Sequence, residues 1–124
     1  MKVLIIDDEI DLCLLLKSYF QKRGFEVILS YSLLDGKEKI GEHKPDYLFL
    51  DYNLPDGLGW DIAPEVAIKY PTIKQFLISA YHPPIPQMPS FAVYQTLEKP
   101  ISFSDLDTFF SDAAYNSAGG IQEY

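Results

Sequence analysis

Residues 3–8 read VLIIDD, four aliphatic side chains followed directly by two aspartates. Residues 47–51 repeat this arrangement as YLFLD, a hydrophobic run that ends in a third aspartate. Continuous apolar runs of this length are typical of strands buried on both faces of a parallel sheet. Because the carboxyl ends of parallel strands meet at one edge of the sheet, we expect the carboxylates of Asp7, Asp8 and Asp51 to lie close together.

Three carboxylates at one edge repel one another, and each raises the pKa of its neighbours. A cation is therefore expected among them. Mg²⁺ fits because proteins usually hold it with one or two carboxylates, several waters and a phosphate. The pattern indicates magnesium-dependent phosphoryl chemistry at this edge.

Strands and helices alternate along most of the chain. Further strands are predicted at residues 25–29, 73–78 and 94–97. The spacing of apolar residues predicts a first helix after residue 8, which ends at Gly24, and a second helix at about residues 33–42, capped by Ser32. Two more helices are predicted, and Pro64 lies in the first turn of the third. The expected core residues of the first, third and last helices are Leu12, Leu15, Leu16, Tyr19 and Phe20, then Ile62, Val66 and Ala67, and finally Leu106, Phe109, Phe110 and Ala113. This alternation predicts an α/β fold with a doubly wound parallel sheet.

A cluster of prolines interrupts the alternation between the fourth and fifth predicted strands. Pro83, Pro84, Pro86 and Pro89 all lie where a helix would be expected to cross back over the sheet. Proline removes a backbone donor and clashes with the preceding turn, so it breaks helices. We therefore expect the fourth helix to be shortened or replaced by a proline-rich loop.

Composition narrows the classes of function. The chain has 124 residues, of which 48% are hydrophobic, and a formal net charge of -8. Its acidity disfavours direct nucleic-acid binding, which requires Lys and Arg to neutralise phosphates. No run approaches the roughly 18 apolar residues that a membrane span needs, so we expect no membrane insertion. Cys13 is the only cysteine, which favours a buried thiol and a cytoplasmic location.

Four separated motifs together resemble the response-regulator receiver domain of two-component signalling. They are Asp7-Asp8, the stretch from Asp51 to Gly59, Ser79-Ala80, and Lys99-Pro100, each after a predicted strand. The resemblance covers essentially the whole chain. It implies a five-stranded sheet with the flavodoxin-like order 2-1-3-4-5, a receiver domain over residues 1–118 and a flexible tail over residues 119–124.

The resemblance also implies the chemistry. Asp51 matches the residue that accepts a phosphoryl group from a sensor histidine kinase or a histidine phosphotransfer protein. The side chains of Asp7, Asp8 and Asp51, with the backbone carbonyl of Asn53, would hold Mg²⁺. Such a protein is a signalling phosphoacceptor rather than a conventional enzyme.

Two further residues complete the implied site. Lys99 would neutralise the phosphoryl oxygens, and the Lys99-Pro100 peptide is expected to be cis. Ser79 matches the hydroxyl that moves toward the phosphoryl group and passes the signal to an unknown downstream protein.

One position departs from the family pattern. Receivers usually carry an aromatic residue three positions before the lysine, where this chain has Thr96. Tyr94 lies on the same face of the predicted strand, where a role in the core or at its rim is expected.

Two exposed apolar pairs are candidate partner contacts. Ile10 and Leu14 are one helical turn apart and point away from the predicted core face, so we expect a kinase or phosphotransfer protein to pack there. Ile85 and Met88, in the proline-rich segment, are expected to contact a downstream partner.

Three other functions share parts of this pattern. A phosphorylation-independent interaction module with a degraded switch is favoured by Thr96 and the proline cluster. A flavodoxin-like nucleotide or flavin carrier would need a phosphate-cradling loop after the first strand, where Asp7, Asp8 and Glu9 would repel phosphate. An aspartate-nucleophile phosphatase would place its second acid at Glu9 and would need a lid domain.

Overall fold

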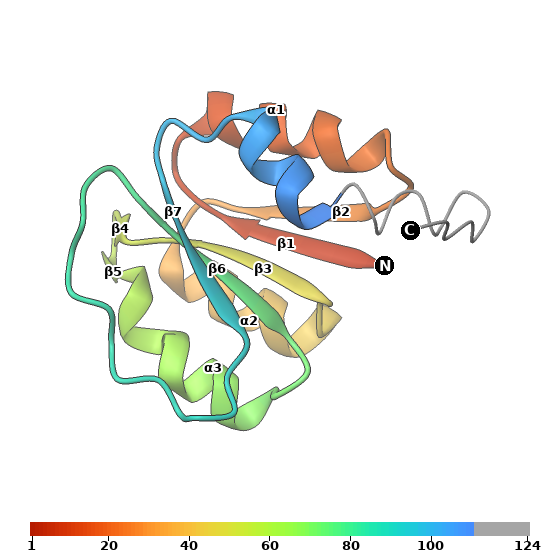
Figure 1. Ribbon diagram of the computed structural model, residues 1–124. Helices are drawn as coiled ribbons and strands as arrows, with labels where there is room; N and C mark the ends of the chain where they lie inside the picture. The colour runs from red at the N-terminus through yellow and green to blue at the C-terminus, as the bar shows by residue number, and fades with distance from the viewer. Residues whose placement is uncertain (111–124) are drawn as a thin grey trace.

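The structure is a computed structural model that describes residues 1–110. Five strands form one parallel sheet in the order β2-β1-β3-β6-β7 (Figure 1). This order confirms the predicted doubly wound architecture, with β6 and β7 as its fourth and fifth strands. The strands of the sheet are β1 (Lys2–Ile6), β2 (Glu26–Ser30), β3 (Tyr47–Asp51), β6 (Lys74–Ser79) and β7 (Tyr94–Glu98).

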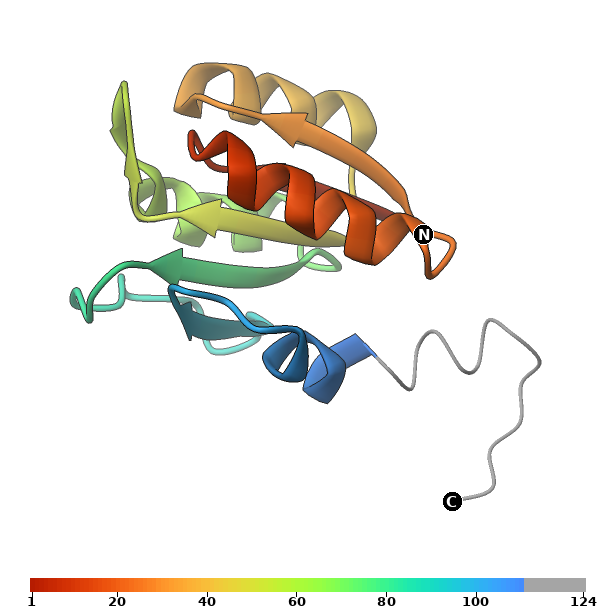
Figure 2. The same ribbon diagram turned by 90° about the horizontal axis from the view of Figure 1, so that it is seen from above.

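Helices cover both faces of the sheet. In Figures 1 and 2, α1 and the final helix lie on one face, and α2 and α3 lie on the other. A short hairpin and a 3-10 helix connect β3 to α3. These elements are α1 (Ile10–Gln21), α2 (Leu33–His43), β4 (Asn53–Leu54), β5 (Gly57–Leu58), η1 (Gly59–Ile62), α3 (Ala63–Lys69) and a final helix through residues 103–110.

The central strands are buried on both faces, as their continuous apolar sequences predicted. In β1, Val3 and Ile5 point into the core beneath α1 and the final helix, whereas Leu4 and Ile6 point into the core beneath α2 and α3. All four are fully buried. Two separate cores therefore hold β1 and β3 rigidly, and the residues that follow these strands are fixed in position.

Local sequence signals set the helix boundaries where they were expected. The Ser32 side chain accepts a hydrogen bond from the backbone N–H of Asp35 and caps α2. Asp56 adds a second cap, because its carboxylate accepts from the backbone N–H groups of Leu33 and Leu34. Pro64 lies in the first turn of α3, where its missing N–H costs no helical hydrogen bond.

Some expectations need correction or lie beyond the described chain. Leu15 was predicted to be in the core, but its side chain is 44% exposed because it lies on the outer side of α1. Residues 53–59, for which the sequence predicted neither a strand nor a helix, contain the β4–β5 hairpin. Ala113, the end of the predicted domain at residue 118 and the predicted tail over residues 119–124 lie outside the described residues.

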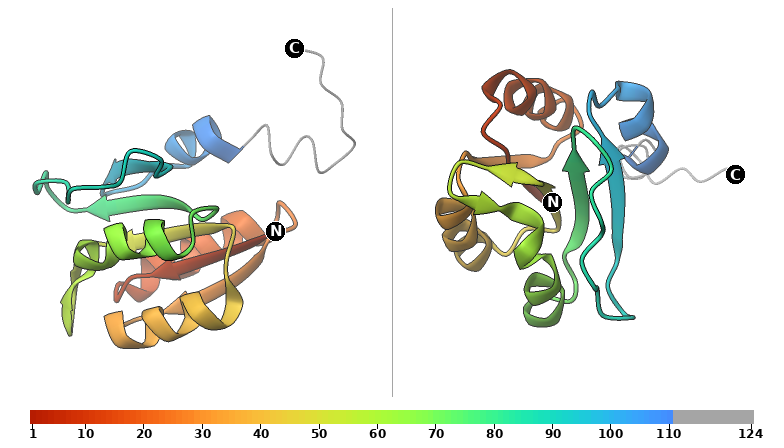
Figure 3. Two further views of the ribbon diagram at one scale, coloured as in Figure 1. Left: turned by 90° about the horizontal axis from the view of Figure 1, so that it is seen from below. Right: turned by 90° about the vertical axis from the view of Figure 1, so that its left-hand side faces the viewer.

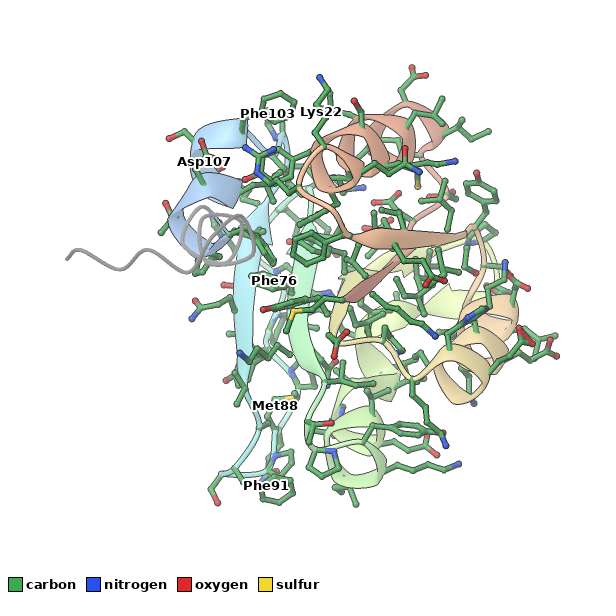
Figure 4. All side chains as sticks on the ribbon, turned by 90° about the vertical axis from the view of Figure 1, so that its right-hand side faces the viewer. Lys22, Phe76, Met88, Phe91, Phe103 and Asp107 are labelled. Carbon is green, nitrogen blue, oxygen red and sulfur yellow. The ribbon has the colours of Figure 1, made fainter. Side chains whose placement is uncertain are left out.

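The proline-rich segment between β6 and β7 contains no helix, as predicted. Met88 was expected to be an exposed contact, but it is half-buried and packs against the core on the α2 and α3 side of the sheet. Figure 4 shows Met88 and Phe91 on this segment, at the opposite end of the sheet from Phe103. An apolar side chain in an extended connector thus replaces part of the packing that a helix would supply.

A polar clamp fixes the final helix to α1. The Tyr19 hydroxyl donates to the Asp107 carboxylate at 2.6 Å, and the Arg23 guanidinium lies 3.2 Å from the same carboxylate oxygen. Figure 4 shows Phe103 and Asp107 on the final helix near Lys22 at the end of α1. Among residues 1–110, no helix is long and apolar enough to cross a membrane.

Candidate functional site at the carboxyl ends of the strands

The three predicted aspartates come together at one edge of the sheet. Asp7 and Asp8 follow β1, and Asp51 is the last residue of β3, which is hydrogen-bonded to β1. Each aspartate offers a carboxylate oxygen, and these oxygens all lie within 4.8 Å of one another. The fold therefore produces the cluster of carboxylates that the strand ends predicted.

The three aspartates differ in solvent exposure. Asp7 is fully buried and Asp51 is 4% exposed, whereas Asp8 is exposed. One oxygen of Asp7, Oδ1, accepts a hydrogen bond from the backbone N–H of Glu9 at 2.8 Å. The other, Oδ2, makes no well-oriented hydrogen bond, although the Lys99 ammonium lies 3.0 Å away. A buried carboxylate oxygen in this state can accept a further cation.

Lys99 is the cationic centre of the site. It follows β7 directly, and the Lys99-Pro100 peptide is cis, as expected. The Nζ atom lies 3.0 Å from Asp7 Oδ2, 3.0 Å from Glu9 Oε1 and 3.4 Å from Asp51 Oδ1. Sequence reasoning did not predict Glu9 as a partner of this lysine. Its only signal was its place directly after the aspartate pair.

Burial and mutual repulsion set the charge states of the aspartates. Burial raises the pKa of Asp51 to about 6, and the neighbouring Asp7 charge adds to the increase, while Lys99 opposes it. Burial also raises the pKa of Asp7, against the lowering effect of the Glu9 N–H and Lys99. Burial alone would lower the pKa of Lys99, but Glu9, Asp7 and Asp51 outweigh it and raise that pKa. Both aspartate shifts are in the direction expected for carboxylates that resist joint ionisation when they are buried next to one another.

The β4–β5 hairpin closes the site on one side. Gly59 donates its N–H to the Tyr52 carbonyl at 2.8 Å, and a Cβ atom at Gly59 would overlap the Asp51 carbonyl oxygen. Glycine is therefore required for the chain to return so close to Asp51. The resulting pocket has a volume of about 260 Å³ and is lined by Asp8, Glu9, Asp51, Tyr52, Asn53, Ala80, Tyr81 and Lys99.

Ser79 does not point into this pocket. Its side chain is buried, and its hydroxyl donates to the backbone carbonyl of Tyr81. Ser79 instead lines a neighbouring hollow of about 280 Å³ between β7 and the proline-rich segment, together with Trp60, Tyr81 and Thr96. The structure thus brings the predicted aspartates and lysine together, while the predicted hydroxyl is engaged beside them.

A cluster of three aromatic side chains, which was not predicted as a group, borders the pocket through Tyr52 and Tyr81. The Tyr52 ring packs edge-on against Trp60 at 5.2 Å and against Tyr81 at 5.6 Å between ring centroids. Trp60 is buried, and its indole N–H donates to the Leu50 carbonyl at 3.1 Å. No pattern in the sequence linked these three aromatic residues, since they come from two separate connections, β3 to α3 and β6 to β7.

The donor set fits Mg²⁺. The clustered side chains supply only hard carboxylate oxygens, and the unbonded Asp7 Oδ2 leaves one of them open to a cation. Asn53 lies in the same pocket, where it is exposed. When bound, the ion would neutralise the aspartates and the oxygens of a phosphoryl group.

Three of the four predicted partner contacts are exposed. Ile10 and Leu14 on α1 are 58% and 52% exposed. Ile85 is 50% exposed. Met88 is the exception, as described above.

Several solved structures share this fold. A receiver domain protein from Methanospirillum hungatei JF-1 aligns with 94% of this chain and 95% of its own, at a TM-score of 0.76 and 20% identity. The signal receiver domain of a DNA-binding response regulator from Colwellia psychrerythraea 34H gives a TM-score of 0.80 at 16% identity, covering 93% and 98% of the two chains. The response regulator TrrA of Thermotoga maritima, solved with Mg²⁺ and BeF, gives 0.72 at 23% identity, covering 90% and 96%. Figure 3 shows the arrangement of this chain from two further sides.

Sequence comparisons agree with the fold. The chain is similar to the uncharacterized transcriptional regulatory protein YvcP of Bacillus subtilis (strain 168), with 39% identity over 61 residues, or 48% of this chain. It spans only 26% of that relative's length. The model of the family described as the response regulator receiver domain matches residues 3–110. That match includes all residues of the acidic pocket, and the chain therefore belongs to the response regulator receiver domain family.

Proposed function

We propose that Asp51 accepts a phosphoryl group from a sensor histidine kinase or a histidine phosphotransfer protein. A carboxylate oxygen of Asp51 attacks the phosphorus of a phosphohistidine, and the bond from phosphorus to the imidazole nitrogen breaks. The products are an acyl phosphate on Asp51 and a free histidine on the donor. The phosphorylated domain then signals by binding a downstream protein differently.

The chain's own residues support this step through charge. Lys99 lies next to Asp51 and can move its ammonium group to the oxygens of the incoming phosphoryl group. Asp7, Asp8 and Asp51, with the Asn53 carbonyl, would hold Mg²⁺. The observation that carries the proposal is Lys99, placed within 3.4 Å of Asp51 and 3.0 Å of Asp7 in one pocket.

Phosphorylation with a small donor tests the proposal. The chain is incubated with acetyl phosphate and Mg²⁺, and the phosphorylated fraction is followed by intact mass. We expect a single phosphoryl group per chain, lost in Asp51→Asn and in the presence of a magnesium chelator. Asp61→Asn is the matched control, because it removes an exposed acid outside the pocket. Modification of Asp51→Asn at the parent rate would contradict the assignment.

We place the phosphodonor on the exposed apolar surface of α1. Ile10 directly follows Glu9, which lines the acidic pocket, and Leu14 lies one turn further along α1. An exposed apolar pair in this position suits a packed helix of the donor. Ile10→Asp with Leu14→Asp should reduce phosphotransfer from the cognate donor while leaving acetyl phosphate labelling unchanged. Ile68→Asp, on α3 and 66% exposed, is the control. Equal phosphotransfer to both variants would rule out this surface.

A phosphorylation-independent interaction module is the second candidate. The Ser79 hydroxyl is engaged by the Tyr81 carbonyl, and Thr96 replaces the usual aromatic residue, so both parts of the usual switch are altered. In that case Ile85 contacts the partner protein both with and without a phosphoryl group on Asp51. Beryllofluoride with Mg²⁺ separates the two candidates. If the chain is a phosphoacceptor, backbone chemical shifts should change from Asp51 to the β6–β7 segment. If it is a phosphorylation-independent module, they should not change.

A further inference from the structure

Glu9 lies at the start of α1 but does not cap this helix. It is the N-cap residue, a position at which the side chain of Ser, Thr, Asp or Asn usually bonds to a backbone N–H of the first turn. The Glu9 side chain makes no such bond. Its carboxylate is 61% exposed and accepts a hydrogen bond from the Lys99 ammonium at 3.0 Å instead. The residue that could cap α1 is therefore engaged at the acidic pocket, and a local rule of helix formation is broken next to the site.

Glu9 is the best-oriented partner of Lys99 among the three carboxylates near it. Asp7 Oδ2 also lies 3.0 Å from Nζ, but it accepts no well-oriented hydrogen bond, and Asp51 Oδ1 is 3.4 Å away. Within residues 1–110, only the Glu9 contact of this ammonium has both the distance and the direction of a hydrogen bond. The Lys99 ammonium is thus directed at the exposed rim of the pocket, away from the carboxylate that is proposed to receive the phosphoryl group.

Glu9 and Lys99 stand between two hollows. Together with Ala80 they line the acidic pocket and also a groove of about 420 Å³ that α1 forms with the connection after β7. Among the residues that line this groove, Glu9 alone has an acidic side chain. The other lining residues are Leu12, Leu15, Pro100 and Ile101. The ammonium therefore has two sets of acceptors, the Glu9 carboxylate at the rim and the oxygens inside the acidic pocket.

A phosphoryl group arriving at Asp51 competes with Glu9 for Lys99. Charge is spread over the phosphoryl oxygens during transfer, and an ammonium beside them lowers the free energy of that state. Lys99 can supply this stabilisation only after its bond to Glu9 breaks. Because ion pairs with one exposed partner are weak, breaking this bond should slow the transfer by roughly two- to fivefold.

We propose that Glu9 is a latch for Lys99: it holds the ammonium at the rim of the pocket while Asp51 is unmodified and releases it to the arriving phosphoryl group. The proposal rests on the function proposed for Asp51. Glu9 is a positioning residue in this account, because it acts through Lys99. The latch slows the gain of a phosphoryl group. It does not affect the loss of that group, because Lys99 has already left Glu9 when loss begins.

Two substitutions separate the latch from a simple effect of charge. Glu9→Gln removes the charge and weakens the bond to Lys99. Glu9→Asp keeps the charge on a side chain that is shorter by one methylene group and better suited to capping α1. With excess Mg²⁺ and acetyl phosphate, both variants should phosphorylate Asp51 roughly two- to fivefold faster than the parent chain, followed by intact mass at early times. After removal of the donor, both should lose the phosphoryl group at the parent rate.

Glu38→Gln is the matched control. It removes the same charge from an exposed side chain of α2 that lines neither hollow, so both of its rates should equal those of the parent chain. A second measurement needs no phosphoryl group. In a chain labelled with ¹⁵N-lysine, the ammonium resonance of Lys99 is identified by its absence in Lys99→Arg. This resonance should shift in both Glu9 variants and stay in place in Glu38→Gln.

The outcomes distinguish the latch from its rivals. Faster phosphorylation in Glu9→Gln alone would overturn the latch, because Glu9 would then act only as a charge at the rim. Parent rates in both variants would also overturn it, as would equal changes in gain and loss, which indicate a displaced α1. A parent chain that takes up no label would contradict the function proposed for Asp51 but not the contact between Glu9 and Lys99. The lysine resonance tests that contact by itself, and an unchanged resonance in both Glu9 variants would refute the latch.

Discussion

At the scale of single residues, the site is a balance of charge around Asp51. The fold buries Asp7 and Asp51 side by side, and Lys99 compensates for only part of their charge. Such an arrangement destabilises the domain until a cation or a phosphoryl transfer changes the balance. If Asp51 is the phosphoacceptor, as proposed, stability and function oppose each other at this residue.

Removing the Asp51 charge should stabilise the domain without metal. Its pKa rises from 3.8 to about 6 on folding, so the folded state binds this proton more tightly than the unfolded state. The penalty is absent below the unfolded pKa and complete above the folded pKa. At pH 8 with a chelator, Asp51→Asn should raise the free energy of unfolding by about 1 to 3 kcal/mol, measured by urea denaturation.

The raised pKa of Asp51 also determines how this residue makes the free energy of unfolding depend on pH. The Asp51 contribution to the stability of the metal-free parent should fall as the pH rises from 3.8 to about 6, and Asp51→Asn should remove that contribution. Asp35 and Asp56, whose pKa values are lowered, contribute in the opposite direction in both proteins. Asp7 leaves a residual slope, because burial raises its pKa too. Asp61→Asn, the exposed control, should change stability by less than about 0.5 kcal/mol. A less stable Asp51→Asn would show that Lys99 overcompensates the repulsion.

At the scale of elements, close backbone packing positions Asp51. Gly59 lets η1 begin directly against the carbonyl of Asp51. This contact, together with the Gly59 hydrogen bond to Tyr52, joins the hairpin to the end of β3. The position of the Asn53 carbonyl thus depends on a glycine outside the strand.

Adding a methyl group at Gly59 should disturb the site. Gly59→Ala must move the Asp51 carbonyl or η1, and overpacking of this kind costs about 1 to 3 kcal/mol. We expect lower stability in urea together with weaker Mg²⁺ binding. Gly41→Ala is the control, because its Cβ would meet only the Tyr70 hydroxyl at 3.4 Å and alanine favours the helix. If Gly59→Ala is destabilised but binds Mg²⁺ normally, the hairpin does not position the residues that hold Mg²⁺.

The clamp between α1 and the final helix should contribute independently. Tyr19→Phe removes the hydroxyl that donates to Asp107 and leaves the ring packing, so a loss of about 1 kcal/mol is expected. Hydrogen exchange through residues 103–110 should increase. Tyr31→Phe, whose side chain is 43% exposed, should change neither quantity. Unchanged exchange in Tyr19→Phe would mean that apolar packing alone holds this helix.

At the scale of the whole molecule, the sequence predicted the features that depend on hydrophobic periodicity and on the residues at the ends of strands. The apolar runs before Asp7 and Asp51 predicted the central strands, and the prolines predicted the missing fourth helix. Leu15 was misplaced because three- and four-residue spacing alone cannot locate the edge of a helix face. The buried face of α1 passes through Cys13, Leu16 and Phe20 and leaves Leu15 outside it. The direction of the Ser79 side chain could not be predicted from the sequence, because its hydroxyl bonds to the Tyr81 carbonyl, whose position depends on the conformation of the β6–β7 connection.

The identity of the modified residue tests the central claim most directly. After phosphorylation with acetyl phosphate and Mg²⁺, the acyl phosphate is reduced with borohydride, and the labelled peptide is sequenced by mass spectrometry. We expect the label on Asp51 alone, with Asp7, Asp8 and Glu9 unmodified. A label on any of these three, or none under conditions in which Mg²⁺ binds, would contradict the assignment of Asp51 as the phosphoacceptor.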